Sequence, residues 1–270
     1  MGGFIGPVGG LVEVPFTSSE PEDVPSRSTY RTALSGRVTE QRGPRGRRTW
    51  DCSIDVSRPD DHHILDQVSA GMIGKGPYVW YSAMARVTNI LTPDQSMMMG
   101  GAWSGGAEGG AGVTSDGVRY LGSLTGDLDS VIFIRDTIPV PPEHPLAVSV
   151  YVSTHPSKVA WLHVTELDPE GATVGTPWTT SVPADTHAQR AAITLTTSVR
   201  TVAVRVMVTS ALMVTLPSVS ITSRPMGWSA GRGCVSASLN LRGSDPRLAF
   251  ESADGWGRRE SRTFTIHELG

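Results

Sequence analysis

This chain has few of the residues that build zinc sites, disulfide scaffolds or nucleic-acid interfaces. Its 270 residues include only two cysteines, Cys52 and Cys234, with no CxxC spacing and no histidine cluster beside them, so we expect no zinc site. We expect both thiols to be free and buried, and a disulfide only if the fold brings them together in an oxidising setting. The net charge of −3 supplies no global basic field that would attract nucleic acid.

Long apolar runs and catalytic signatures are also missing. No stretch approaches the roughly 18 apolar residues of a membrane span. The start, MGGFIGPVGGLVEVP, lacks the basic and apolar regions of a secretory signal, so we expect synthesis in a cytosol. There is no GxSxG, HExxH or GxxxxGK[ST] motif, and we expect neither an enzyme nor a bound cofactor. A carboxylate pair for glycoside hydrolysis stays open, because its members can be distant in sequence.

Apolar and polar residues alternate with period two along most of the chain, which predicts an all-β fold. In RTWDCSIDV, the side chains of Trp50, Cys52, Ile54 and Val56 share one face and polar side chains occupy the other. The same alternation predicts strands in PYVWY, SVIFIRD, PLAVSVYVST, VAWLHVTEL, QRAAITLTT, TVAVRVMVTS, VTLPSVSIT, CVSASLNLRG and TFTIHEL. The 30 glycines and 19 prolines suit the many turns that such strands need.

One short helix is the predicted exception, in SRPDDHHILDQVSAGMIGKG. Ser57 suits its N-cap and Pro59 an early helical position. Its apolar stripe comprises Ile64, Leu65, Val68 and Met72. His62 and His63 are adjacent on this helix, so they point in different directions and we expect no shared metal.

Two breaks in this pattern predict the domain organisation. After NILTPDQS, residues 100–117 are rich in glycine and lack periodicity, and SRPMGWSAGRG forms a second break. The strands beyond that break are too few for a domain of their own. We therefore predict a split β-sandwich or barrel of residues 1–85 and 225–270, with a second β-sandwich of residues 88–223 inserted. On this prediction both cysteines belong to the split domain.

The order of these parts suggests a family. A strand start at Gly36–Arg37, a basic hairpin, an aromatic-led strand with Trp50, a short helix, the PYVWY strand and the NILTP boundary follow one another. In this order they resemble minor tail proteins of tailed bacteriophages that infect actinobacteria, relatives of the distal tail proteins. The inserted segment, with its Gly/Trp loop, PLAVSVYV strand and LDPEG turn, is similar to carbohydrate-binding-module jelly rolls. GWSAGRGC then looks like the return into the tail domain.

The resemblance implies a structural role at the tail tip of a virion, after assembly in the host cytoplasm. Distal tail proteins look like ring formers, commonly hexamers, so the implied partners are copies of this chain, the tail tube protein and other tail-tip proteins. The jelly roll would project outwards and contact host cell-wall polysaccharide. Two other functions stay open: a glycan-binding module for host attachment without a ring, and an accessory of a cell-wall hydrolase.

The basic run QRGPRGRR is the predicted subunit-contact segment. It contains Arg42, Arg45, Arg47 and Arg48. Guanidinium groups pair bidentately with carboxylates, so the run could meet a neighbouring subunit's acidic surface or line the tube lumen. A solvated hairpin tip explains the same run. No recognition motif accompanies it, so we expect no sequence-specific nucleic-acid binding.

Aromatic side chains of the inserted segment are the predicted glycan contacts, because sugar rings present apolar C–H faces that flat rings can cover. In VAWLHVTEL, Leu162 and Val164 are the expected core side, which leaves Trp161 and His163 on the outer or concave face. Tyr151 likewise lies opposite the valines of its strand. The full set of candidates is Tyr151, Trp161, His163, Trp103 and Trp178. For each aromatic, packing or a subunit contact is the alternative.

Asp127 and Asp129, in GDLDS, are the candidate metal ligands. Two carboxylates this close in sequence can share a calcium ion with backbone carbonyls, and jelly rolls of the glycan-binding kind often resemble calcium binders. A turn that enters a strand needs the same residue types, so a purely structural role stays open.

Overall fold

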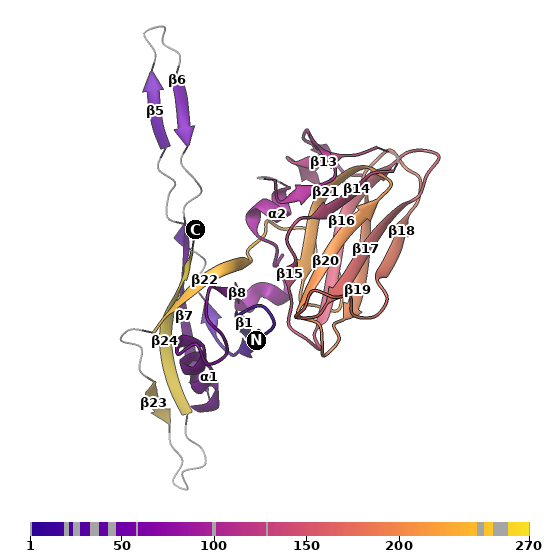
Figure 1. The fold of residues 1–270 in the computed structure, drawn as a ribbon. Coiled ribbons are helices and arrows are strands. Elements are labelled where there is room, and N and C mark those ends of the chain that lie inside the picture. Colours follow the sequence, from indigo (N-terminus) through magenta and orange to yellow (C-terminus); the bar gives the residue numbers. More distant parts are fainter. Residues whose placement is uncertain are drawn as a thin grey trace. The chain divides into compact units, whose positions relative to one another are not determined.

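The computed structural model describes residues 2–18, 22–23, 28–32, 38–42, 47–57, 59–98, 101–127, 129–241, 246–250 and 259–269. The chain divides into two compact units, each assembled from segments that are distant in sequence. Unit 1 is formed chiefly by Val14–Tyr78 and Ser236–Gly270, and unit 2 by Gly2–Glu13 and Val79–Val235. Both consist mainly of antiparallel strands (Figure 1), which confirms the predicted all-β class.

The cysteines do not share a unit. Cys52 lies in unit 1 and Cys234 in unit 2, so our expectation that one domain holds both is wrong in this division. Both thiols are free and buried, and burial raises the pKa of the Cys52 thiol. The same division groups residues 2–13 with unit 2, whereas the sequence pattern predicts them in the split domain. The domain ranges that we derived from the sequence stay a prediction.

The long strand β24 (Arg259–Glu268) lies at the centre of unit 1, between two neighbouring strands. Its strands are β3 (Thr17–Ser18), β4 (Glu22–Asp23), β5 (Ser28–Thr32), β6 (Val38–Arg42), β7 (Arg48–Ser57), most of β22 (Cys234–Asn240), β23 (Arg247–Phe250) and β24 (Arg259–Glu268). β24 lies between β7 and β22, and β5 and β6 pair with each other but with no third strand in the described part of the chain. Trp50 and Cys52 of β7 are buried, as the alternation predicted, and they pair with Ile266 and Phe264 of β24. The side chain of Val56 lies outside the described part.

The helix of unit 1, α1 (Pro59–Ser69), is shorter than its apolar pattern predicted. Leu65 and Val68 are fully buried, as expected from the stripe. Met72 lies beyond the helix end and is 73% exposed, so its place in the stripe was wrong. The apolar pattern predicts a helix one turn too long, because Met72 has helical spacing but no apolar core to pack against.

Polar contacts hold α1 against the sheet. His62 is buried and its Nε2 lies 3.0 Å from Ser57 Oγ, whereas His63 is exposed. The guanidinium of Arg262, on β24, donates to the Asp66 carboxylate at 2.8 Å. The two histidines therefore do not converge on one site.

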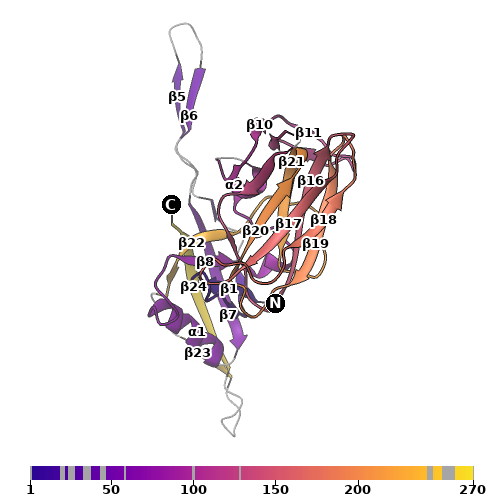
Figure 2. The same cartoon turned by 45° about the vertical axis from the view of Figure 1, so that its right-hand side comes forward.

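Unit 2 is a sandwich of two antiparallel sheets, whose strands run along its length in Figure 2. In spatial order, the five-stranded sheet consists of β10 (Ala107–Gly109), β13 (Ser123–Thr125), β21 (Ala211–Ser220), β16 (Pro145–Thr154) and β19 (Gln189–Thr196). The six-stranded sheet consists of β18 (Trp178–Val182), β17 (Ala160–Leu167), β20 (Ala203–Thr209), β14 (Val131–Ile134) and β9 (Trp103–Ser104), with β15 (Ile138–Pro139) beside β20. The remaining strands are β1 (Gly3–Gly6), β2 (Val12–Val14), β8 (Tyr78–Tyr81), β11 (Gly112–Val113) and β12 (Arg119–Tyr120).

The sandwich core comes from the alternating valines that the sequence predicted. Val148, Val150, Val204 and Val206 are at most 1% exposed and belong to one apolar cluster. Arg205, between the last two, is exposed on the opposite face. Three short strands, β9, β10 and β11, lie where we expected only an aperiodic glycine-rich loop, because strands of two or three residues are too short to show a period.

The NILTPDQS segment contains a second α-helix, α2 (Pro93–Met97), preceded by the 3₁₀-helix η1 (Ala83–Arg86). Our prediction of a single helix was therefore incomplete. Thr92 accepts a hydrogen bond from the Gln95 backbone N–H, and the Gln95 side chain accepts one from the Thr92 N–H. This capping box is legible in the sequence T-P-D-Q, with proline at the first helical turn.

The chain enters and leaves the sandwich side by side at Asn89, whose side chain is 1% exposed and fully hydrogen-bonded. Its amide nitrogen donates to the carbonyl oxygens of Pro217 and Ser229, at 2.9 and 3.1 Å. Its oxygen accepts from the backbone N–H groups of Leu91 and Val219, at 3.2 and 3.0 Å. One buried amide thus joins the outgoing segment, the returning segment and β21.

The segment Gly2–Glu13 is attached to unit 2 by a strand pair and an ion pair. β1 pairs with β8, and Glu13 accepts a hydrogen bond from Arg86 Nη2 at 2.6 Å. The other carboxylate oxygen lies 3.6 Å from His144 Nε2. Burial opposes ionisation of Glu13, but Arg86 and His144 outweigh it and lower the pKa of this carboxyl.

Candidate functional site

One face of the six-stranded sheet carries partly exposed side chains. In its central strands Leu162, Val208 and Ile132 pair with one another and are fully buried, so the residues between them point the other way. Those outward side chains form two rows that run from β18 to β14. The first row is Ser181, Trp161, Thr209 and Val131, and the second is Thr179, His163, Met207 and Phe133. We call these two rows the Trp161 face.

The Trp161 face combines apolar surface with hydroxyl groups. Trp161 is 44% exposed and Val131 41%, while Phe133 and Met207 are half-buried. The Thr209 hydroxyl lies in the same row as the indole, between Trp161 and Val131. A sugar has the same two properties, since it offers apolar C–H faces and a rim of hydroxyls.

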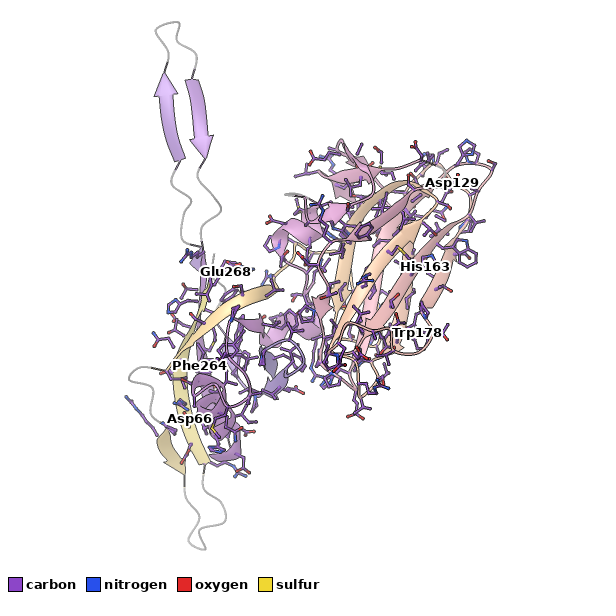
Figure 3. All side chains as sticks on the ribbon, viewed as in Figure 1. Asp66, Asp129, His163, Trp178, Phe264 and Glu268 are labelled. Atoms are coloured by element: carbon purple, nitrogen blue, oxygen red, sulfur yellow. The ribbon has the colours of Figure 1, made fainter. Side chains whose placement is uncertain are left out.

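His163 lies in the middle of this sheet, between Asp129 at one end of the sandwich and Trp178 towards the other (Figure 3). Its Nε2 is 3.1 Å from the Thr209 hydroxyl oxygen. Burial lowers the pKa of His163, so the imidazole is neutral at neutral pH. The face therefore offers a neutral hydrogen-bonding group next to the tryptophan.

Trp178 is 43% exposed but lies on the other side of the sheet from Trp161. It pairs with Val164, three residues from Trp161, and an odd offset along a strand reverses the face. Its indole nitrogen donates to Glu166 at 3.0 Å. Glu166 is buried and also accepts hydrogen bonds from the Ser198 N–H and the Thr201 hydroxyl. The two exposed tryptophans therefore do not form one platform.

Trp103 and Tyr151 present no open ring face to solvent. Trp103 is 4% exposed, packs in the sandwich core and donates from its indole nitrogen to the Gln95 carbonyl at 2.7 Å. Tyr151 is also 4% exposed, and its hydroxyl donates to the Asp116 carboxylate at 2.7 Å. Burial, together with Asp116, raises the pKa of Tyr151 to about 12. Both side chains have packing roles in this structure.

An apolar cavity of about 300 Å³ lies in the part of unit 2 that covers Tyr151. Tyr120, Leu121, Leu216 and Trp228 contribute to its lining. Leu216 adopts a φ of +49° at an irregularity in the pairing of β16 with β21. None of the candidates from the sequence lines this cavity, so it is separate from the Trp161 face.

The predicted basic run is divided between different environments. Arg47 is exposed, the backbone of Arg42 ends β6, and Arg45 lies outside the described residues, as do Gly36 and Arg37. Arg48 is buried in unit 1, where its Nε and Nη2 donate to the two carboxylate oxygens of Glu268, each at 3.0 Å. Its guanidinium also lies 4.9 Å from the Trp50 ring centroid. Arg48 is therefore already paired within its own unit.

Asp127 and Asp129 do not converge in the structure. The Asp127 backbone N–H donates to the Ser130 hydroxyl at 2.5 Å, which is a turn contact. Asp129 is highly exposed and pairs with Lys158 Nζ at 2.8 Å. Across the described ranges, no three His, Cys, Asp or Glu side chains are arranged to hold a metal ion. Neither helix in the described part is long and apolar enough to cross a membrane.

Sequence reasoning missed the apolar partners of Trp161. Val131 and Phe133 alternate with the buried residues Ile132 and Ile134, and Met207 alternates with the core valines of β20. Those alternations were visible, but only the register of β14, β20 and β17 shows that the outward residues share two rows.

Comparisons with known proteins give distant likenesses. No family model matches this chain. No curated protein matches it either. Among solved structures, it is similar to the enzymatically active domain of tailspike protein 4 from bacteriophage CBA120, with 10% identity, a TM-score of 0.40, and coverage of 49% of this chain and 21% of that one.

Two further likenesses are to carbohydrate-related structures. The CBM22-1–GH10 modules of a Clostridium thermocellum endo-1,4-β-D-xylanase, complexed with xylohexaose, match with 12% identity, a TM-score of 0.35, and coverage of 53% of this chain and 30% of that one. A structure of carbohydrate-binding modules from the β-sandwich superfamily matches with 10% identity, a TM-score of 0.31, and coverage of 76% and 96%. The chain spans less than a third of the tailspike and xylanase chains.

Proposed function

We propose that this protein is a structural component of a bacteriophage tail whose sandwich binds a glycan of the host surface through the Trp161 face. The observation that carries the proposal is the half-exposed indole of Trp161, set among apolar side chains and hydroxyls on a sheet. The tail assignment is supported by the order of sequence features that resembles minor tail proteins. A rigid sheet suits such a site, because its side chains need little ordering when a ligand binds.

The positions of two carboxylates of this sheet favour binding of a glycan without its cleavage. Glu166, on the same strand as Trp161, faces the other side of the sheet and already accepts three hydrogen bonds. Asp129, at one end of the face, is paired with Lys158. A glycosidase needs two carboxyl groups flanking one bond, about 5–10 Å apart. We therefore propose a binding protein rather than a hydrolase.

The test compares two equally exposed tryptophans. Purified host-wall polysaccharide is titrated against the wild-type chain, Trp161→Ala and the matched control Trp178→Phe. Losing a central aromatic contact costs about 2 kcal/mol or more, so Trp161→Ala should weaken binding by at least about tenfold. Trp178→Phe should bind within about twofold of wild type, because Trp178 is on the other side of the sheet. Equal binding by all three proteins would remove the Trp161 face from consideration, and glycan turnover by the wild type would replace binding with hydrolysis.

A ring at the tail tip is the finer form of the proposal, and the hairpin of β5 and β6 favours it. These strands pair with each other and with no other strand of the described chain. A two-stranded hairpin is marginally stable alone in water, and both of its edges expose unpaired backbone groups. A neighbouring copy could cover those edges, and the exposed Arg47 lies in the same part of the sequence.

Light scattering with particle imaging tests the ring. The wild-type chain should form a closed symmetric assembly, alone or on the tail tube as template. Replacing Ser28–Arg42 by a short Gly-Ser linker should abolish assembly and leave the unfolding of unit 2 unchanged. Assembly that survives this replacement would exclude the hairpin as the subunit contact.

A further inference from the structure

The six-stranded sheet carries a third outward row, beyond the two rows of the Trp161 face. In the pairing of β17 with β20, Trp161 is opposite Thr209, His163 is opposite Met207, and Thr165 is opposite Arg205. Since outward residues recur every second position, Arg205 occupies the same side of the sheet as Trp161. The third row thus ends the face with a guanidinium group.

Arg205 is exposed, and its guanidinium has no hydrogen-bond or ion-pair partner among the described residues. Its neighbours Val204 and Val206 are at most 1% exposed, which forces the charged side chain outwards. Arg135, directly after β14 and so at the same end of the face, is also exposed and forms no ion pair in the described part. Asp136, next to it, pairs with neither arginine within that part.

The opposite end of the face carries two acidic side chains and one basic one. There the Lys158 ammonium is 2.8 Å from the Asp129 carboxylate, and the exposed Asp127 lies in the turn that leads into β14. His163, in the middle row, is kept neutral by burial. The positive charge of this face that has no anion paired with it in the described part therefore lies at the Arg205 end, and the opposite end is acidic.

We propose that the glycan is acidic, with a sugar ring on Trp161 and a carboxylate or phosphate paired with Arg205. This inference rests on the proposed function and adds the ligand's charge to it. Thr209 and Arg205 are four residues apart on β20, which corresponds to about 13 Å along the strand. A ligand that reaches both must contain several sugar units and lie along the strands. Guanidinium pairs bidentately with either anion, which gives affinity and fixes the direction of the chain.

Matched probes isolate the charge from the sugar. The full-length protein is titrated at low salt with an α-1,4-oligogalacturonate, with its methyl ester, and with a poly(glycerol phosphate) chain. The ester has the same rings and lacks the charge, so the acid should bind at least about tenfold more tightly. The phosphate polymer separates phosphate from carboxylate recognition. Salt should weaken binding of the acid far more than binding of the ester.

Three variants test which residue causes a preference for the acid over its methyl ester. Arg205→Gln should bring acid and ester within about twofold of each other, without weakening the ester. Trp161→Ala should weaken both. Arg119→Gln, a change of an exposed arginine on β12 outside this sheet, is the matched control and should leave the preference intact.

The outcomes separate this inference from the function on which it rests. Equal binding of acid and ester that depends on Trp161 would overturn the acidic ligand and leave glycan binding standing. A preference that survives Arg205→Gln would also overturn it. Binding of the phosphate polymer alone, lost in Arg205→Gln, would support the anion and identify it as phosphate. If none of the probes binds, the acidic ligand is overturned, and the titration with host-wall polysaccharide decides separately whether the proposed face binds a glycan.

Discussion

The strongest test of the fold is the replacement of Asn89, where the chain enters and leaves the sandwich. The Asn89 side chain is 1% exposed, and Asn89→Ala removes four hydrogen bonds from it. Two of them are donated by the amide nitrogen and two are accepted by the amide oxygen. The carbonyls of Pro217 and Ser229 and the N–H groups of Leu91 and Val219 then lose a partner inside the protein. Leaving a buried backbone group unsatisfied costs about 1–3 kcal/mol, so we expect a loss of about 4 kcal/mol.

Thermal and urea unfolding measure this loss. A change of 1 kcal/mol shifts Tm by about 2–4 °C in a unit of 150–250 residues, so Tm of unit 2 should fall by about 8–16 °C. Asn89→Asp keeps the acceptor and loses both donors, and it places a carboxylate against two carbonyls. It should therefore be at least as destabilising as alanine at neutral pH and less so in acid, where the group is protonated.

Thr194→Ala is the control, because Thr194 is exposed on β19 of the same unit. A surface substitution of this kind is expected to stay within about 0.5 kcal/mol of wild type. A fall in Tm of less than about 3 °C for Asn89→Ala would show that the four contacts are replaced by water or by relaxation. The reasoning that one amide joins the outgoing and returning segments would then be wrong.

Three further outcomes follow from buried or paired groups. Arg48→Met should destabilise unit 1 by about 3 kcal/mol in urea unfolding, because it removes the guanidinium that pairs with the largely buried Glu268 carboxylate, and adding Glu268→Gln should recover most of the loss. Tyr151→Phe removes the hydrogen bond to Asp116 and should cost about 1 kcal/mol, while glycan affinity stays unchanged because this ring is buried. The folded pKa of Glu13 is lowered, so its contribution is present above the unfolded pKa and is lost as pH falls through the folded pKa. Glu13→Gln should therefore lower Tm at pH 7 by a small amount, and the difference from wild type should shrink as the pH falls through the lowered pKa of Glu13, whereas a constant difference would contradict the ion pair.

The alternation of side chains predicted the strands and the core, because period two depends only on which face is buried. The valines of β16 and β20 and the outward position of Trp161 were all readable in this way. The short strands of the glycine-rich region were not, since two or three residues carry no period. β18 was also missed: its sequence WTTSV shows little apolar alternation because the strand lies at the edge of its sheet.

The second helix could have been predicted from its capping residues, whereas the pairing of Arg48 could not. The sequence T-P-D-Q specifies a capping box and an early proline, yet we predicted only a turn there. Arg48 was grouped with its basic neighbours because they are adjacent in sequence. Its pairing with Glu268 joins residues more than two hundred positions apart, and no local pattern can show such a contact.

The candidate site shows where sequence periodicity stops being informative. Alternation assigns each residue to one of two faces within its own strand, but it does not relate the faces of different strands. Trp161 and Trp178 are exposed to the same extent, and only the pairing of Trp178 with Val164 places them on opposite sides of the sheet. The same register places Arg205 on the side of Trp161, from a strand some forty positions away. Both the rejected tryptophan and the proposed charge contact therefore depend on strand register, and a comparison of Trp161, Trp178 and Arg205 variants tests that register together with the function.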